Sequence, residues 1–181
     1  MKFTTSTVIS SVFFAGTALA APSKPQAFDV MALRSASPIH FASLSAAKSS
    51  LFLNLPKQDA QCKGENNRAV LYLQGSKLFL YSDGDKLQQV FVDRSGMGQG
   101  KIGYIDSDSQ PPRNSELEGW SINGDGNLVF DNKILQACPN SIDGAWAVWT
   151  TDVAEPAGNK GCLGFSPRTL PNDKPVSCVY S

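Results

Sequence analysis

The sequence predicts a single compact all-β domain that is stabilised by disulfides. Short apolar segments rich in Val, Ile, Phe and Tyr recur along the chain, and Gly, Pro, Asn, Asp and Ser separate them, as in antiparallel sheets. The 4 cysteines all follow an apolar leader, and an even cysteine count in a secreted chain indicates disulfides. About twelve short strands fit a β-trefoil-like or other closed barrel, and a β-sandwich is the alternative.

The first 20 residues have the features of a secretory signal peptide. Lys2 supplies a positive charge, Val8–Leu19 is apolar and small, and Ala18–Ala20 has the small-x-small pattern of a cleavage site. The apolar run is shorter than the ~20 residues that span a bilayer. We therefore expect cleavage after Ala20, a mature domain of residues 21–181, and no membrane contact after the signal is removed.

The charge of the chain is balanced, with 16 basic and 16 acidic residues. Loss of Lys2 with the leader leaves 15 basic residues against 16 acidic ones. Electrostatic capture of nucleic acid or of an anionic membrane needs a basic excess or a basic run, and neither is present. We therefore expect no nucleic-acid partner.

Most of the mature chain reads as short strands. The expected strands are Phe28–Leu33, Ile39–Phe41, Val70–Leu73, Leu78–Tyr81, Val90–Val92, Ile102–Ile105, Trp120–Ile122, Leu128–Phe130, Ile134–Leu135, Ala145–Trp149, Cys162–Phe165 and Val176–Tyr180. Leu44–Leu55 is dominated by Ser and Ala, so one or two helical turns are expected there. Val30–Phe41, Val70–Leu80 and Trp120–Phe130 resemble one another at a spacing of roughly 40–50 residues, which is the argument for a trefoil.

The cysteines allow three connectivities. We favour Cys162–Cys178, because Pro171–Asp173 would turn two short strands back on each other. That choice leaves Cys62–Cys138 as a long-range bridge. Wide spacings of this kind do not match a zinc site.

A loop that contains Gly96, Gly98 and Gly100 joins the expected strands Val90–Val92 and Ile102–Ile105. Its candidate recognition residues are Asp93, Arg94 and Lys101. It is not a P-loop, because Ser95 stands where the first glycine is needed and Ile102 follows Lys101. It is not a dinucleotide fingerprint either, because the third glycine is missing and a strand follows. The loop is either a recognition surface or a structural plug, with Asp93 and Arg94 paired to each other or to backbone groups.

Aromatic residues offer a second candidate surface. Trp120, Trp146 and Trp149 would suit a carbohydrate platform, but large aromatics more often anchor small β cores. We expect Trp120 and Trp146 in the core and Trp149 at the surface.

The sequence offers little to support catalysis. His40 is the only histidine, it lies in an expected strand, and no Gly-x-Ser-x-Gly elbow accompanies it. Asp83–Asp85 and Asn123–Asn127 carry oxygen ligands, but they lack the later acidic ligands of a calcium loop. We assign no catalytic residue, no metal ligand and no cofactor.

The loop and three other segments resemble a known family. Asp93–Tyr104, Ser45–Ser50, Gly119–Ile122 and Ala137–Trp146 are similar to segments of the fungal cell wall proteins of the phiA (phialide development) type. The resemblance implies a secreted, non-enzymatic cell wall protein with a role in phialide and conidium formation and in stress protection. It supplies no catalytic residue.

The expected partners are cell wall components, polysaccharide among them. The C-terminus has no hydrophobic tail of the kind that a GPI signal requires, so attachment would be non-covalent or through another linkage. The alternative is a lectin-like module that binds wall polysaccharide, and a small secreted hydrolase is the third candidate.

Overall fold

The computed structural model describes Met1 and residues 25–181, and the described chain is almost entirely β. The rest of the predicted leader, residues 2–20, lies outside the described residues. The strands are β1 (Ala27–Leu33), β2 (Leu44–Ala47), β3 (Ser50–Leu53), β4 (Ala60–Cys62), β5 (Leu71–Gln74), β6 (Lys77–Leu80), β7 (Gln88–Asp93), β8 (Lys101–Asp106), β9 (Ser115–Glu116), β10 (Trp120–Ile122), β11 (Leu128–Phe130), β12 (Leu135–Cys138), β13 (Trp146–Thr150), β14 (Leu163–Pro171) and β15 (Cys178–Tyr180), with short 3₁₀ turns η1 (Ile142–Gly144) and η2 (Pro156–Gly158). The all-β prediction is confirmed. No helix of the described part is long and apolar enough to cross a bilayer.

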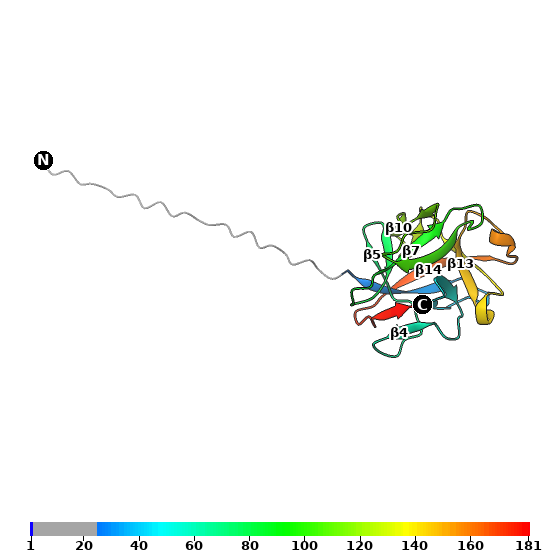
Figure 1. The fold of residues 1–181 in the computed structure, drawn as a ribbon, viewed down its shortest axis with the longest axis horizontal. Coiled ribbons are helices and arrows are strands. Elements are labelled where there is room, and N and C mark those ends of the chain that lie inside the picture. The colour runs from blue at the N-terminus through cyan, green and yellow to red at the C-terminus, as the bar shows by residue number, and fades with distance from the viewer. Residues whose placement is uncertain (2–24) are drawn as a thin grey trace.

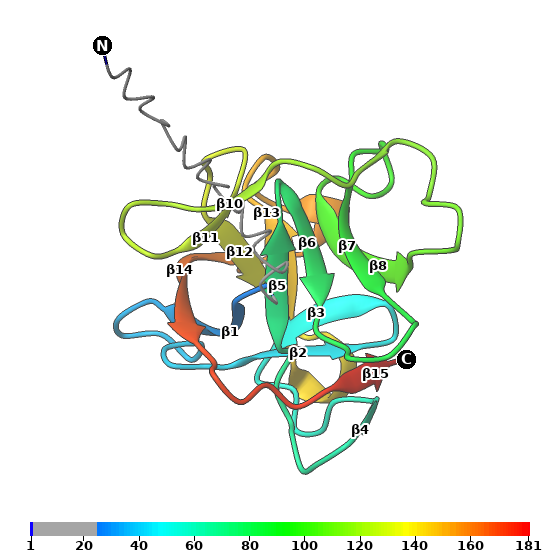
Figure 2. The same cartoon turned by 90° about the vertical axis from the view of Figure 1, so that its left-hand side faces the viewer.

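Eleven strands form one antiparallel sheet in the order β2-β3-β8-β13-β12-β14-β1-β5-β6-β7-β9. The sheet returns on itself, because β7 also pairs with β8 along its whole length and β8 meets β13 at the pair Lys101↔Trp149. Because only one residue pair joins β8 to β13, the ring of strands is irregular, and the arrangement is also compatible with the sandwich alternative. Two small sheets, β10–β11 and β4–β15, lie at opposite ends of the molecule (Figure 1 and Figure 2).

The internal repeat behind the trefoil prediction is not carried through in the described residues. Val70–Leu80 contains the hairpin β5–β6, which is part of the large sheet. Trp120–Phe130 contains β10–β11, which stands outside it. Val30–Phe41 contains β1 and a turn rather than two paired strands. The three segments therefore do not form three equivalent units.

The main hydrophobic core is built from one face of most strands. Leu51 and Leu53 of β3, Ile102 and Tyr104 of β8, and Val148 of β13 all belong to it. Successive side chains of a strand point to opposite faces, so the residues between these five face away from the core. Some of the side chains that point away from the core in this way line the candidate functional site.

Two predicted elements are wrong. Leu44–Leu55 forms the hairpin β2–β3 instead of helical turns, because Leu44, Ala46, Leu51 and Leu53 are buried against the main core and that packing outweighs the local Ser and Ala content. Ile39–Phe41 is a turn in which the Phe41 amide donates to the Ala32 carbonyl at 2.8 Å.

The chain has two disulfides and no free cysteine among the described residues, but the favoured pairing is wrong. Cys62 is bonded to Cys178 and Cys138 to Cys162. After Cys162 the chain does not turn back, because the nine-residue β14 pairs first with β12 and then, over six residues, with β1, and so delivers Cys178 to β4. There Cys178 lies directly opposite Cys62 in the strand register. Cross-linking across these sequence separations of 116 and 24 residues stabilises the fold by roughly 5 and 3 kcal/mol.

Candidate functional site

The glycine-rich loop is a rigid turn between β7 and β8. The Gly100 amide donates to the Asp93 carbonyl at 2.8 Å, and the Gln99 amide donates to the Ser95 carbonyl at 2.9 Å. The side chain of Asp93 turns into the loop, where its Oδ1 accepts the Ser95 amide at 2.8 Å. These bonds leave the Asp93 carboxylate committed to its own loop.

Two glycines of the loop are needed for close packing. A Cβ on Gly98 would lie 2.0 Å from Cγ of Asp93, so only glycine leaves room for the carboxylate. Gly100 has a φ of +89°, and a Cβ there would lie 2.1 Å from Oγ1 of Thr150. By contrast, nothing lies within 4 Å of a Cβ placed on Gly96.

Arg94 is the centre of a salt-bridge cluster. Its guanidinium contacts Glu116 through Nε at 2.8 Å, Asp131 through Nη2 at 3.1 Å, and Asp152 through Nη1. The Cζ atom also lies 5.1 Å from the centre of the Phe130 ring, and the side chain is only 25% exposed. Asp93 and Arg94 do not pair with each other, and both are used inside the domain.

Asp152 has a second cationic partner, Lys133. The hydrogen bond from Lys133, with a further one from Arg94, lowers the pKa of the Asp152 carboxyl to about 2. The Asp152 carboxylate therefore stays ionised well below neutral pH. This network connects β7, β9, the turn after β11, and the turn after β13.

Lys101 has a different environment. It begins β8 and points away from the core, on the same side as Phe52 of β3 and Ala147 and Trp149 of β13. These side chains, together with residues 138–142 and the η2 region, enclose a hollow of about 340 Å³. Lys48, Ser50, Phe52, Lys101, Cys138, Pro139, Asn140, Ser141, Ile142, Ala147, Trp149 and Asn159 line it. We call it the lysine hollow.

The prediction that Trp149 reaches the surface is wrong, because its side chain is only 6% exposed. It does point away from the main core, and it lines the same hollow as the segment after β12. Trp120 is 1% exposed and belongs to the main core, and Trp146 is partly buried against that core, as expected for both. Trp149 thus forms part of a wall of the hollow instead of an open platform.

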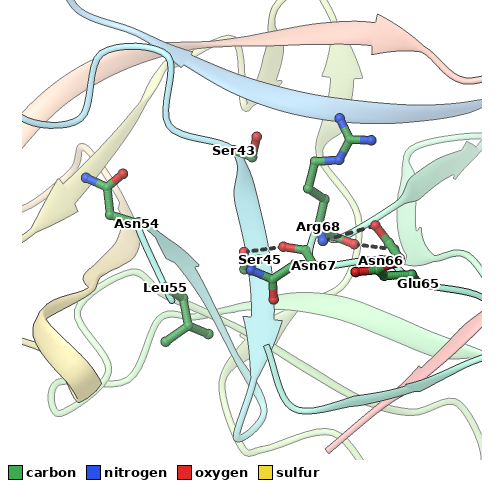
Figure 3. A pocket seen from close by; sticks show the side chains of 8 residues that line it. All are labelled: Ser43, Ser45, Asn54, Leu55, Glu65, Asn66, Asn67 and Arg68. Atoms are coloured by element: carbon green, nitrogen blue, oxygen red, sulfur yellow. Dashed lines mark hydrogen bonds between the residues drawn. The ribbon is translucent and has the colours of Figure 1, made fainter. Parts of the chain in front are cut away.

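A second hollow, of about 440 Å³, lies beside β2 and the segment after β4 (Figure 3). Its polar side chains already form hydrogen bonds within the domain. Ser45 Oγ donates to the Asn67 carbonyl at 3.1 Å, Asn67 Oδ1 accepts the Gln58 amide at 2.7 Å, and Asn66 Nδ2 donates to the Arg68 carbonyl at 2.8 Å. These groups hold a long loop in place and leave few partners for a ligand.

His40 and the Asn123–Asn127 segment also have hydrogen-bond partners within the domain. His40 Nδ1 accepts the Arg34 amide at 3.2 Å, and its ring stacks on Phe41 with centroids 3.8 Å apart. Asn123 Oδ1 accepts the amides of Asp125 and Asn127, so this segment is a hairpin turn whose oxygen already has donors.

Sequence reasoning did not find Lys48 or Phe52 as site residues. Both lie in the segment that was predicted as helical turns. Strand alternation in Ser50–Leu53 would have placed Phe52 on the face opposite Leu51 and Leu53. The signal was therefore present in the sequence, but the Ser and Ala content concealed it.

Comparison with known proteins assigns the chain to a family. A family model described as PhiA-like secreted protein matches residues 28–181. The chain belongs to the PhiA family. The match begins at β1 and ends with the last residue, so it includes both disulfides and all of the lysine hollow.

Three relatives within the PhiA family are each named "Cell wall protein phiA". The protein of Emericella nidulans is 45% identical over 184 residues, which cover 100% of both chains. That of Aspergillus fumigatus is 47% identical over 156 residues (85% of this chain and 84% of the relative), and that of Aspergillus niger is 40% identical over 176 residues (94% and 96%). No solved structure matches the chain significantly. The chain is thus a secreted cell wall protein.

Proposed function

We propose that this PhiA-family protein is a non-enzymatic component of the fungal cell wall that acts in asexual development, in phialide and conidium formation, and in stress protection. The observation that carries the proposal is the likeness to relatives named cell wall proteins along the whole described domain. The protein is held in the wall by contacts with wall components rather than by a membrane.

The arrangement of ionisable groups supports a non-enzymatic role. Catalytic acids and bases need a free lone pair or proton within reach of a substrate. The carboxylates around Arg94 are instead bound by Arg94 and Lys133. The Nδ1 atom of His40 accepts a backbone amide, whereas a catalytic histidine usually donates from one ring nitrogen to an orienting carboxylate.

Deletion of the gene tests the developmental role. The deletion strain is expected to form fewer phialides and conidia and to survive oxidative and heat stress less well. Re-expression of the parent protein is expected to restore the numbers of phialides and conidia and the survival under both stresses. Normal sporulation and survival in the deletion strain contradict the proposal.

Fractionation and enzyme assays test the other two parts. Culture is separated into medium, detergent-extractable wall and covalently bound wall, and the protein is expected in the extractable wall. Purified protein is incubated with glucan, chitin and mannan, and no reducing ends should appear. Protein found only in the medium refutes wall retention, and product release refutes the non-enzymatic assignment.

A lectin-like role is the second candidate function. The lysine hollow favours it, because an apolar floor with a polar rim is the usual form of a small-ligand site. A glycan array with purified protein separates this role from a purely structural one, since only a lectin retains a specific set of glycans.

A further inference from the structure

We propose that the lysine hollow binds an anionic sugar residue of a wall polysaccharide, one that carries a carboxylate or a phosphate. The inference rests on the proposed association with the wall and names the chemistry of the ligand. Three features support it: two lysines without carboxylate partners, an apolar floor, and a strained turn that places one of the lysines.

The charge of the hollow is the first feature. Lys48 and Lys101 are both exposed, and no carboxylate lies within 4.0 Å of either ammonium group among residues 25–181. Other lysines of the domain, such as Lys63, Lys77 and Lys133, do form ion pairs. Two unpaired ammonium groups at one hollow favour a ligand with negative charge.

The glycine loop keeps Lys101 free. Asp93 is the cross-strand partner of Lys101 in the β7–β8 register, and an ion pair between such neighbours is normally favourable. Here the Asp93 carboxylate is turned into the loop by the Ser95 amide and occupies the space that Gly98 leaves open. The loop therefore removes the nearest competing anion from Lys101.

The turn before β3 places Lys48. Lys48 and Ser49 have φ values of 47° and 52°, which makes this a two-residue turn of the primed kind. Such turns favour Asn and Gly, and a Lys-Ser pair there is strained. The turn is held by the Ser49 amide, which donates to a carboxylate oxygen of the C-terminal Ser181 at 3.0 Å. The fold thus maintains an unfavourable conformation that brings Lys48 to the hollow.

The floor and rim indicate a sugar rather than a bare inorganic anion. Phe52 and Trp149 are only 4% and 6% exposed, so with the partly exposed Ala147 they supply a small apolar surface on which the C–H face of one sugar ring can pack. Asn140 adds a side-chain amide that suits hydroxyl groups, whereas Nδ2 of Asn159 already donates to the Pro156 carbonyl at 2.7 Å. The volume of about 340 Å³ is near the lower limit of ligand sites, which fits a single residue of a longer chain.

Binding of defined oligosaccharides tests the inference. Calorimetry at low ionic strength compares oligogalacturonate, a mannose oligosaccharide with phosphate groups, neutral chitin and β-glucan oligomers, and inorganic phosphate. We expect at least one of the two charged oligosaccharides to bind more than tenfold tighter than any neutral oligomer and than phosphate, with affinity that falls as salt is added. The two charged probes distinguish a carboxylate from a phosphate as the recognised group.

Variants locate the binding. Lys48→Ala/Lys101→Ala should weaken binding of the charged oligosaccharide at least tenfold, whereas Lys48→Arg/Lys101→Arg should keep most of it. Lys86→Ala, an exposed lysine that does not line the hollow, is the matched control and should bind like the parent. Thermal melts check that every variant is folded, since surface substitutions of this kind should change stability by less than ~0.5 kcal/mol.

Three results overturn the inference: equal binding of charged and neutral oligomers, no binding of either charged probe, or full binding by the folded double alanine variant. Wall fractionation of the parent protein is scored separately. If the parent stays in the wall while neither charged probe binds, the proposed wall association stands and only this inference fails.

Discussion

Replacing Arg94 by alanine should destabilise the domain by about 3 kcal/mol. The two pairs with the half-exposed Glu116 and Asp131 account for ~0.2–1 kcal/mol each. The hydrogen-bonded pair with the more buried Asp152 accounts for ~1.5–3 kcal/mol, and the contact with Phe130 for ~0.5–1 kcal/mol. These terms share one side chain and are not additive, so the total lies below their upper sum.

Urea unfolding at pH 7 with the disulfides intact measures this loss. In a domain of this size, about 3 kcal/mol corresponds to a melting temperature lower by ~6–12 °C. Lys77→Ala is the matched control, because its pair with Glu118 is exposed on both sides (45% and 64%) and should be worth less than ~1 kcal/mol.

Acid distinguishes lost ion pairs from lost packing. Removing Arg94 leaves Glu116, Asp131 and Asp152 near one another without their shared cation. Protonation of Asp152, whose pKa is lowered to about 2 by hydrogen bonds from Lys133 and Arg94, ends its ion pair with Arg94, so the difference between parent and Arg94→Ala should shrink as the pH falls through about 2. If the free energy of unfolding of Arg94→Ala at pH 7 lies within ~0.5 kcal/mol of that of the parent, the structural role of Arg94 is refuted.

Three further predictions concern the loop, the acid limb and the disulfides. Gly98→Ala should cost more than ~2 kcal/mol in urea unfolding because its Cβ meets the Asp93 carboxylate, whereas Gly96→Ala, with open space around it, should be nearly neutral; equal stability of the two contradicts the packing argument. The pKa of Asp152 is lowered from 3.8 to about 2, so the stabilisation from its ionised form is complete above about pH 4 and is lost as the pH falls through 2. This stabilisation is worth ~1–2 kcal/mol after solvent screening. In Asp152→Asn the free energy of unfolding should therefore change less between pH 4 and 2, and the same pH dependence as in the parent counts against the assignment. Peptide mapping without reduction should recover only the two cysteine pairs of the structure and no alkylated thiol, and any other pairing disproves the register.

Local pattern predicted most strands of this domain. Short apolar segments between turn residues, such as Trp120–Ile122 and Leu128–Phe130, have the predicted bounds. The pattern is reliable there because the flanking Gly, Asn and Asp residues mark the turns that end each strand. It failed for β2 and β3, where small Ser and Ala side chains carry little information on burial. The core that orders this hairpin comes from strands far away in the sequence.

The candidate site was predicted less well, because its partners are distant in sequence. Arg94 was correctly placed in a shaped loop, but its carboxylates come from three separate turns or strands that no local pattern connects. The disulfide pairing depended in the same way on the long register between β1 and β14. Of the predicted loop residues, Lys101 is the one that the fold leaves available.

Under mechanical tension, the Cys62–Cys178 bridge limits how far the domain can lengthen. A wall swells and stretches with turgor, and a protein that is held at two points is pulled along its chain. The bridge keeps the 116-residue segment between the two cysteines out of the path of the force. Complete unfolding of residues 25–181 would then release only about 40 residues, or roughly 140 Å of chain, against roughly 460 Å with Cys138–Cys162 alone intact and roughly 550 Å with both bridges reduced. Reduction of both bridges would therefore let the unfolded domain reach about four times the length of the oxidised one.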